Sequence, residues 1–162
     1  MKKLIVLVVL IMCATVVFAQ TNAVSLDVYP AIVGIDQSGN GLLRVNVGAG
    51  FEHAMSRNLS IGADLDFYLS SWTNYSQVFF GLIGKGRYYP ASQALEGFFL
   101  GAGTGVGFSK VTNVDSKLNL IIEIEAGYKI MFSSLFVEPS IAYSYGRMWG
   151  SWKPGLRAGF CF

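Results

Sequence analysis

Few side chains in this sequence are of the types that carry chemistry in enzymes. His53 is the single histidine, so a nucleophile activated by histidine, or a metal site that needs one, would have to use it. A histidine performs acid–base work only beside a positioned partner. His53 falls on the outward register at the end of the second predicted strand, and an interfacial side chain is the favoured interpretation. We expect no enzymatic activity.

Two further features have simple structural explanations. The Gly-x-Gly-x-Gly run from Gly101 to Gly107 has no following helix to cradle a phosphate, which argues against a nucleotide-binding loop. Cys161 is the one thiol left once the leader that contains Cys13 is removed, so an internal disulfide is excluded. We interpret Cys161 as a small filler on the last strand and predict no cofactor and no metal.

The main chemical feature is a set of acidic and basic residues on one face of alternating segments, spaced among Gly and Ser. They could line a pore, or they could form a plug of salt bridges in a narrow lumen. The plug is favoured if the eight alternating segments described below close into a barrel, because the bore of an eight-stranded barrel is about filled by side chains. The predicted network consists of Asp27, Arg44, Glu52, Asp64, Asp66, Lys85, Arg87, Glu123, Glu125, Lys129, Glu138 and Arg157.

Residues counted outward from each turn come level with one another, and their charges match. The predicted pairs are Asp64 with Lys85 or Arg87, Lys129 with Glu138, and Asp27 with Arg157. In addition, the glycines at 101, 103, 105 and 107 leave room for Lys85 and Arg87 to extend over them. Their expected partners there are Glu123 and Glu125, about two strand spacings or roughly 10 Å away.

The elements that would position these charges are strands. From Leu59 to Ser70 every odd residue is apolar, whereas the even ones are Ser, Gly, Asp, Asp, Tyr and Ser. This strict period of two predicts a strand of about the length that crosses a bilayer at a tilt. Eight such segments are expected, at 23–35, 42–54, 59–71, 78–89, 98–111, 119–132, 135–147 and 154–162. Short turn-like stretches join them, including Met148 to Lys153, as antiparallel neighbours require.

One face of these segments is apolar and carries no charge except Lys110 and Arg147 at segment ends. The charged face is mostly Gly and Ser, unlike the Lys- and Glu-rich exterior of a soluble barrel, so we assign the apolar face to the outside. Several apolar residues fall on the charged face, where a narrow lumen needs them for packing. They are Tyr29, Val33, Phe79, Ile83, Phe99, Ile121, Met131 and Phe136.

The chain begins like an exported protein. Lys2 and Lys3 precede an apolar run that ends in Val-Phe-Ala before Gln20, which predicts a signal peptide at 1–19 cleaved between Ala19 and Gln20. Removing it leaves ten basic and ten acidic residues, so the net charge is about zero. No basic patch remains that would favour nucleic-acid binding. Charged residues make up 14% of the chain, against roughly 25% in typical soluble domains.

Aromatic residues gather near the segment ends, as in the two girdles of membrane barrels. One girdle comprises Phe51, Tyr88, Phe98, Tyr128 and Phe132, and the other Phe67, Trp72, Phe80, Phe108, Tyr143 and Tyr145. With the ending Gly-Phe-Cys-Phe, residues 20–162 resemble the small OmpA/OmpX-type outer-membrane proteins. This resemblance implies a closed, eight-stranded, antiparallel up-and-down barrel in the outer membrane. Both termini would be periplasmic, and Phe160 and Phe162 would be read by the assembly machinery.

Two functions fit these expectations. One is a non-enzymatic, monomeric barrel among outer-membrane lipids that supports envelope integrity or presents its loops for surface interaction. The other, by resemblance to OmpW-like barrels, is a passive route for small hydrophobic solutes into the periplasm or bilayer. Lipid A-modifying enzymes have barrels of similar size, but their histidine works at the opposite membrane face from that predicted for His53. Trp72, Tyr75, Trp149 and Trp152, expected in loops, could form a greasy mouth or anchor the barrel at the interface.

Overall fold

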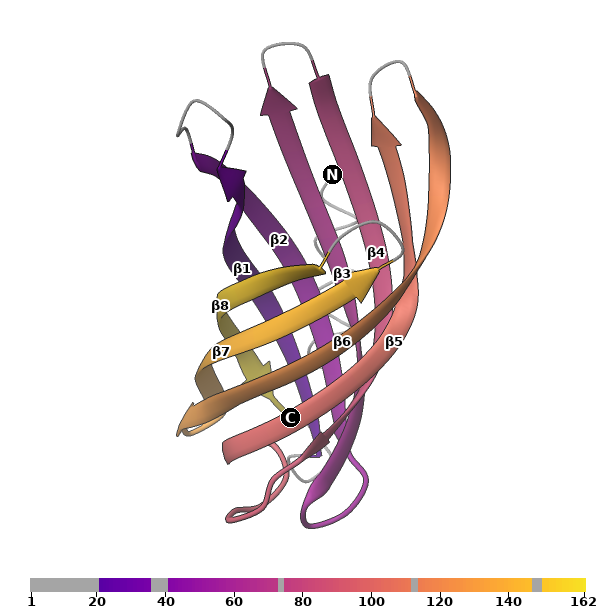
Figure 1. The fold of residues 1–162 in the computed structure, drawn as a ribbon. Coiled ribbons are helices and arrows are strands. Elements are labelled where there is room, and N and C mark those ends of the chain that lie inside the picture. The colour runs from indigo at the N-terminus through magenta and orange to yellow at the C-terminus, as the bar shows by residue number, and fades with distance from the viewer. Residues whose placement is uncertain (1–20, 36–40, 73–74, 112–113, 147–149) are drawn as a thin grey trace, which may run out of the picture.

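The protein is a closed barrel of eight antiparallel strands that pair in chain order (Figure 1). The computed structural model describes residues 21–35, 41–72, 75–111, 114–146 and 150–162. The strands are β1 (Asn22–Ile35), β2 (Gly41–Ala54), β3 (Leu59–Trp72), β4 (Tyr75–Tyr88), β5 (Gly97–Val111), β6 (Val114–Phe132), β7 (Leu135–Gly146) and β8 (Gly150–Cys161). This confirms the predicted fold class. The expected signal peptide and its cleavage site at Ala19 and Gln20 lie outside the described residues.

Burial alternates along the strands with the predicted period of two. On β3, Leu65 is 43% exposed on the outside, whereas its neighbours Asp64 and Asp66 are buried inside at 3% and 6%. The predicted faces are therefore confirmed, with the apolar one outward. No described residue belongs to a helix long and apolar enough to cross a membrane.

The strand boundaries differ where turn-like residues pair after all, and the difference is largest at β6, which begins at Val114 rather than at 119. Strand β4 begins three residues before the predicted start, because Ser70, Ser71 and Trp72 pair with Gln77, Ser76 and Tyr75. Strand β8 begins at Gly150 rather than at 154. The prediction that Lys153 and Trp152 lie in a loop is therefore wrong. In β8, Trp152 points outward and is 61% exposed, whereas Lys153 is buried.

A folded turn closes the end of the barrel at which β1 begins and β8 ends. This turn, residues 89–96 between β4 and β5, is bound to the β2–β3 turn. Asn58 accepts a bond from the Tyr89 amide at 2.8 Å and donates to the Tyr89 carbonyl at 2.7 Å. Leu95, with a φ of 74°, is 4% exposed and packs into a cluster of buried residues. The other members are Ala23, Phe136 and Cys161, with Ala54 and Met131 at the edge. We call residues 89–96 the stopper.

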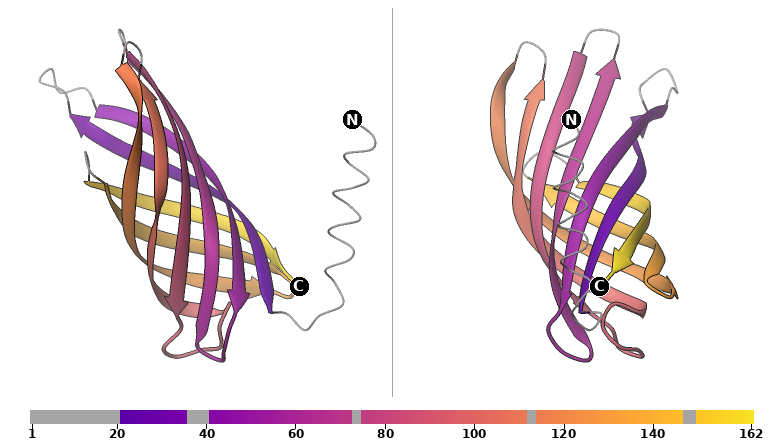
Figure 2. Two further views of the ribbon diagram at one scale, coloured as in Figure 1. Left: turned by 90° about the vertical axis from the view of Figure 1, so that its right-hand side faces the viewer. Right: turned by 180° about the vertical axis from the view of Figure 1, so that it is seen from behind.

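The opposite rim of the barrel is slanted. Strands β3 to β6 rise furthest from the termini, whereas β7 and β8 end much lower (Figures 1 and 2). The line along which β1 and β8 pair, called the seam below, closes the barrel beside the termini. Its pairs run from Ala23 with Cys161 to Val28 with Leu156. In the described residues the ladder between β1 and β8 goes no further, although both strands continue.

Candidate functional site

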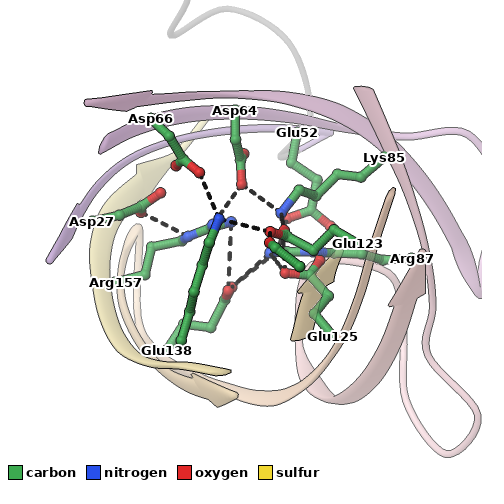
Figure 3. Close-up of polar contacts among 12 residues, drawn as sticks. Asp27, Glu52, Asp64, Asp66, Lys85, Arg87, Glu123, Glu125, Glu138 and Arg157 are labelled. Carbon is green, nitrogen blue, oxygen red and sulfur yellow. Dashed lines mark hydrogen bonds and ion pairs between the residues drawn. The ribbon is translucent and has the colours of Figure 1, made fainter. Parts of the chain in front are cut away.

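Twelve charged side chains fill the middle of the lumen and point toward one another (Figure 3 draws ten of them with labels). Each is at most 9% exposed. They arise from every strand except β5, whose inward positions at this level are glycines, because each strand turns one residue in two inward. Eleven of them were predicted from the sequence: Asp27, Glu52, Asp64, Asp66, Lys85, Arg87, Glu123, Glu125, Lys129, Glu138 and Arg157. The side chain of Arg44, the remaining predicted member, lies outside what the structure describes.

Arg87 on β4 is the centre of the half of the network that is nearer the stopper. Its guanidinium group contacts three carboxylates, with Nε to Glu125 Oε1 at 2.6 Å, Nη1 to Glu52 Oε2 at 2.8 Å and Nη2 to Glu138 Oε1 at 3.1 Å. Its other side packs 4.3 Å from the centroid of the Phe99 ring. Charge-assisted bonds in such a fixed fork are among the strongest hydrogen bonds in proteins.

Lys129 joins the same half of the network from β6. Its Nζ lies 2.6 Å from Glu52 Oε2 and 3.4 Å from Glu138 Oε2, which confirms the predicted pair with Glu138. The ammonium group also lies 4.5 Å from the centroid of the Phe136 ring. Lys129 thereby links the ion pairs to the apolar cluster beneath them.

Lys85 crosses the glycine-rich strand as predicted. Its Nζ lies 3.1 Å from Glu123 Oε1 and 3.1 Å from Glu125 Oε2, and 2.5 Å from Asp64 Oδ2. The space comes from β5, where a Cβ at Gly101 would lie 2.7 Å from Glu125 Cγ and one at Gly103 would lie 3.0 Å from Lys85 Cβ. A larger residue at either position would collide with the network.

Arg157 on β8 joins the seam to the centre of the lumen. Its Nε lies 2.7 Å from Asp27 Oδ1, which confirms the predicted pair across the seam, and its Nη2 lies 2.7 Å from Asp64 Oδ2. Nη2 also donates to the Tyr29 hydroxyl at 2.7 Å. The alternative partner that we considered for Asp64, Arg87, bonds to other carboxylates instead.

Lys153 is the member of the network that the sequence analysis missed. Its Nζ lies 2.8 Å from Asp66 Oδ2 and 2.9 Å from Glu123 Oε2. A signal was available, because Lys153 has the same parity as Arg157 and Gly155 lies between them. The Gly-Ser-Trp-Lys stretch has the composition of a turn, and this composition conceals the inward position of Lys153.

Hydroxyl groups complete the bonding of several carboxylates. Tyr89, in the stopper, donates to Glu52 Oε1 at 2.6 Å, and Ser60 donates to the same oxygen. Burial, together with the negative charge of Glu52, raises the pKa of Tyr89, so the phenol keeps the proton that it donates. Ser144 donates to Glu123 Oε2. The stopper is thus bonded to the ion network directly.

The described part of the lumen holds seven buried carboxylates and five buried cations. In a narrow space with little water, unpaired charges are very costly, so the multiple contacts of each cation are required for the network to exist. Within the described residues, no group of three or more His, Cys, Asp and Glu side chains has the arrangement of a metal site.

His53 lies where the sequence analysis expected it, at the stopper end of β2 with its side chain exposed. Its Nδ1 lies 2.9 Å from Asn22 Oδ1, which is an amide oxygen and cannot relay a proton as a carboxylate would. Cys161 is 2% exposed within the apolar cluster, as its interpretation as a filler requires. Of the apolar residues predicted to fall inward, Tyr29, Ile83, Phe99, Ile121 and Phe136 are buried, and Phe79 and Met131 are half-buried.

Neither a protein-family model nor a curated protein matches this sequence. Solved structures do match. Neisserial surface protein A has a TM-score of 0.70 at 10% identity over 89% of this chain and 98% of its own. The attachment invasion locus protein Ail of Yersinia pestis has 0.63 at 12% over 89% and 100%. The N-terminal barrel of Pseudomonas aeruginosa OprF has 0.55 at 17% over 88% and 98%. The chain therefore shares the fold of small outer-membrane barrels.

Proposed function

We propose that this chain is a non-enzymatic outer-membrane barrel whose lumen is closed to ions and polar solutes. The observation that carries the proposal is the network of twelve buried charges across the lumen, with the stopper beneath it. Each cation of the network is held by at least two carboxylates. Such a barrel contributes to the integrity of the envelope and displays its loops at the cell surface.

Single-channel recording of the purified barrel in planar bilayers tests the closed lumen. We expect no conductance steps from the wild type, and small steps after Arg87→Ala combined with removal of the Leu95 side chain. The exposed turn residue Glu96 provides a matched control, because Glu96→Ala leaves the network intact. Wild-type conductance of the same size as that of the double variant would refute a closed lumen.

An outer-membrane location is supported by the apolar exterior and by the shared fold. We infer that residues 1–19 are removed at Ala19, that both termini face the periplasm, and that outer-membrane lipids surround a single copy of the barrel. The aromatic pair Phe160 and Phe162, with ring centroids 6.3 Å apart, would be the signal for barrel assembly. The mature chain should sediment with outer membranes and migrate faster on unboiled gels. Its recovery in the soluble fraction after osmotic shock would overturn this location.

A role in surface interaction is supported by the kind of protein that shares the fold. One is named a surface protein and another an attachment invasion protein, which was also solved with the heparin analogue sucrose octasulfate. The low identity transfers none of these partners to this chain. We therefore propose surface display without naming the partner.

The second candidate function is a route for hydrophobic solutes. Its exit would be either the periplasm or the bilayer, and the structure supports the second more than the first. Passage through the barrel into the periplasm would have to displace the ion network and then the stopper. Passage sideways into the bilayer, beyond Val28 and Leu156 where the ladder between β1 and β8 has ended, would bypass both. The lateral exit is the version of this candidate that we retain.

A further inference from the structure

Two prolines, one on each strand, coincide with the position at which the pairing of β1 and β8 ends. The β1–β8 pairs follow a constant register, in which Val28 opposite Leu156 is the last. Two positions further on, the same register would bring Pro30 opposite Pro154. Neither residue has a backbone N–H.

The two prolines fall at a position where both N–H groups would be needed. At the start of the seam the Asn22 amide donates to the Phe162 carbonyl at 3.0 Å and the Phe162 amide donates back at 2.8 Å. In an antiparallel ladder such doubly bonded pairs recur at every second residue. Counting from Asn22 by twos reaches Pro30, and counting from Phe162 by twos reaches Pro154. The seam would therefore lose two hydrogen bonds at this one position.

A third proline supports this interpretation. Pro139 on β7 would lie opposite Tyr128 of β6, and there the ladder lapses, since the pairs pass from Gly127 with Ser140 directly to Ile130 with Val137. That gap closes again, because pairing resumes on its far side. Beyond Pro30 and Pro154 the seam does not resume among the described residues.

An unsatisfied polar side chain lies one strand away from the end of the seam. Asn46 on β2 is 3% exposed, and among the described residues neither its amide oxygen nor its amide nitrogen has a hydrogen-bond partner. It pairs with Tyr29 on one side and with Tyr68 on the other. Leaving both groups of a buried amide unbonded is costly, so a native protein keeps such a side chain for a reason.

Apolar surface accompanies this amide. The rings of Tyr68 and Phe79 are stacked with centroids 4.7 Å apart and are half-buried. The Tyr29 ring lies against Gly155 of β8, at the first position beyond the last seam pair, and fills the space that a Cβ there would occupy. The Tyr29 hydroxyl accepts a hydrogen bond from Arg157, so the ring connects this position to the ion network. Tyr29 on β1, Asn46 on β2, Tyr68 on β3 and Phe79 on β4 are paired in one level row that begins at the strand beside the end of the seam.

We propose that Asn46, Tyr29, Tyr68 and Phe79 form a binding site for a small uncharged amphiphile, with a hydroxyl or amide head and a hydrocarbon tail, which enters from the bilayer through the open part of the seam. The amide of Asn46 donates to and accepts from the head, and the aromatic faces pack against the tail. The site rests on the second candidate function, that of a lateral route, and gives it a substrate class. Because Asn46 is covered in the present structure, entry of the ligand displaces the neighbouring rings.

The charges of the lumen favour a ligand whose head group is neutral. The two described cations of β8, Lys153 and Arg157, already bond to carboxylates. The described lumen has two more carboxylates than cations, so a carboxylate head would be repelled. A cationic head would have no free carboxylate to pair with unless it displaced one of these cations. A head that both donates and accepts matches what Asn46 offers.

Cysteine cross-linking tests whether the seam is open. In a Cys161→Ala background, Leu26→Cys with Ala158→Cys lies within the paired part of the seam and should form a disulfide readily in lipid nanodiscs. Ile32→Cys with Trp152→Cys follows the same register beyond the prolines and should not. Equal cross-linking of both pairs would show a closed seam and overturn the proposed entrance.

Ligand titration followed by NMR tests the site itself. With the full mature chain in nanodiscs, 1-decanol should shift the Asn46 side-chain amide resonance saturably, whereas decane, decanoate and decyltrimethylammonium should not. Asn46→Leu should weaken decanol binding, read from the Tyr68 and Phe79 backbone amides, about fivefold, as the loss of one neutral hydrogen bond gives. This variant should fold well, because it removes an unsatisfied group. Asn119→Leu is the matched control, since Asn119 already bonds to Ser109 at 3.2 Å.

Restoring the missing donors should close the entrance. Pro30→Val with Pro154→Val should allow the Ile32→Cys and Trp152→Cys pair to cross-link and should slow decanol binding at least tenfold, whereas Pro139→Val should change neither. Absence of saturable decanol shifts, or equal affinities for decane and decanol, would refute the site. Neither result would bear on the closed lumen, which the conductance measurement tests separately.

Discussion

At the scale of the residue, the most informative side chain is Arg87. It is 2% exposed and bonds to three carboxylates from three different strands. Arg87→Ala should lower the free energy of unfolding by about 3–5 kcal/mol, because it leaves buried carboxylates without a partner. Glu125→Ala should have a cost in the same range, since Lys85 and Arg87 both lose a contact. Denaturant titrations of the folded barrel measure both changes.

The double variant separates a network from independent pairs. Arg87→Ala with Glu125→Ala should cost clearly less than the sum of the single changes, because each single change already breaks the shared contact. Glu96→Ala, on an exposed turn carboxylate, should change stability little. Additive costs, or single variants as stable as the wild type, would contradict a plug that holds the barrel together.

The sequence allowed most of these contacts to be predicted, because parity and turn positions fix which inward residues are level. Asp27 with Arg157 and Lys129 with Glu138 follow from counting alone. Lys153 escaped because a glycine, a serine and a tryptophan beside it resemble a turn, and only pairing with β7 makes them strand. A role for Asn46 could not be predicted, because its amide carries no charge by which to match it to a partner.

At the scale of the element, β3 allows a direct comparison of its two faces. Leu65→Lys should destabilise the barrel by about 2–4 kcal/mol, since a charge on the outer face would lie in hydrocarbon. The adjacent change Asp66→Asn should cost less, because Lys153 retains Glu123 as a partner. Folding yields into bilayers of known composition provide the measurement. Equal tolerance of the two substitutions would remove the assignment of the faces.

The stopper is the second element with a measurable consequence. Cys161 is buried against Leu95, so a maleimide in solution should label the folded wild type very slowly. Leu95→Ala should accelerate labelling at least tenfold by removing the side chain that covers the thiol. Leu156→Ala, on the outer face of the same strand, should leave the labelling rate unchanged. Equal rates in all three proteins would show that the stopper does not seal this end.

The existence and order of the strands could be predicted because alternation persists over eight segments. Their boundaries were harder, since Tyr75, Ser76 and Gln77 have turn-like neighbours and yet complete a hairpin with β3. The stopper could not be predicted at all. Leu95 adopts a positive φ that its residue type disfavours. The burial of its side chain in the apolar cluster offsets the cost of this backbone conformation.

At the scale of the whole molecule, the outside and the inside of the barrel exchange the usual roles. Apolar side chains cover the exterior, and the interior is held by ions and hydroxyl groups. The closed topology could be predicted from the need to leave no strand edge exposed in a membrane. The incomplete seam could not, because it depends on Pro30 and Pro154 meeting at a doubly bonded position, which becomes visible only when the register is known.

The contact between the start of β1 and the end of β8 has a consequence for connectivity. The Thr21 amide donates to the Phe162 carbonyl at 3.1 Å, so in a variant that begins at Gln20 a short peptide could join the two ends, and the chain could be reopened between Ser133 and Ser134 at the same rim. Such a circular permutant should refold into the same barrel, with β1 and β8 now joined as an ordinary hairpin. Its Ile32→Cys and Trp152→Cys pair should still fail to cross-link, because a covalent link supplies no N–H to proline. The open ladder would then be a property of two residues and not of where the chain begins.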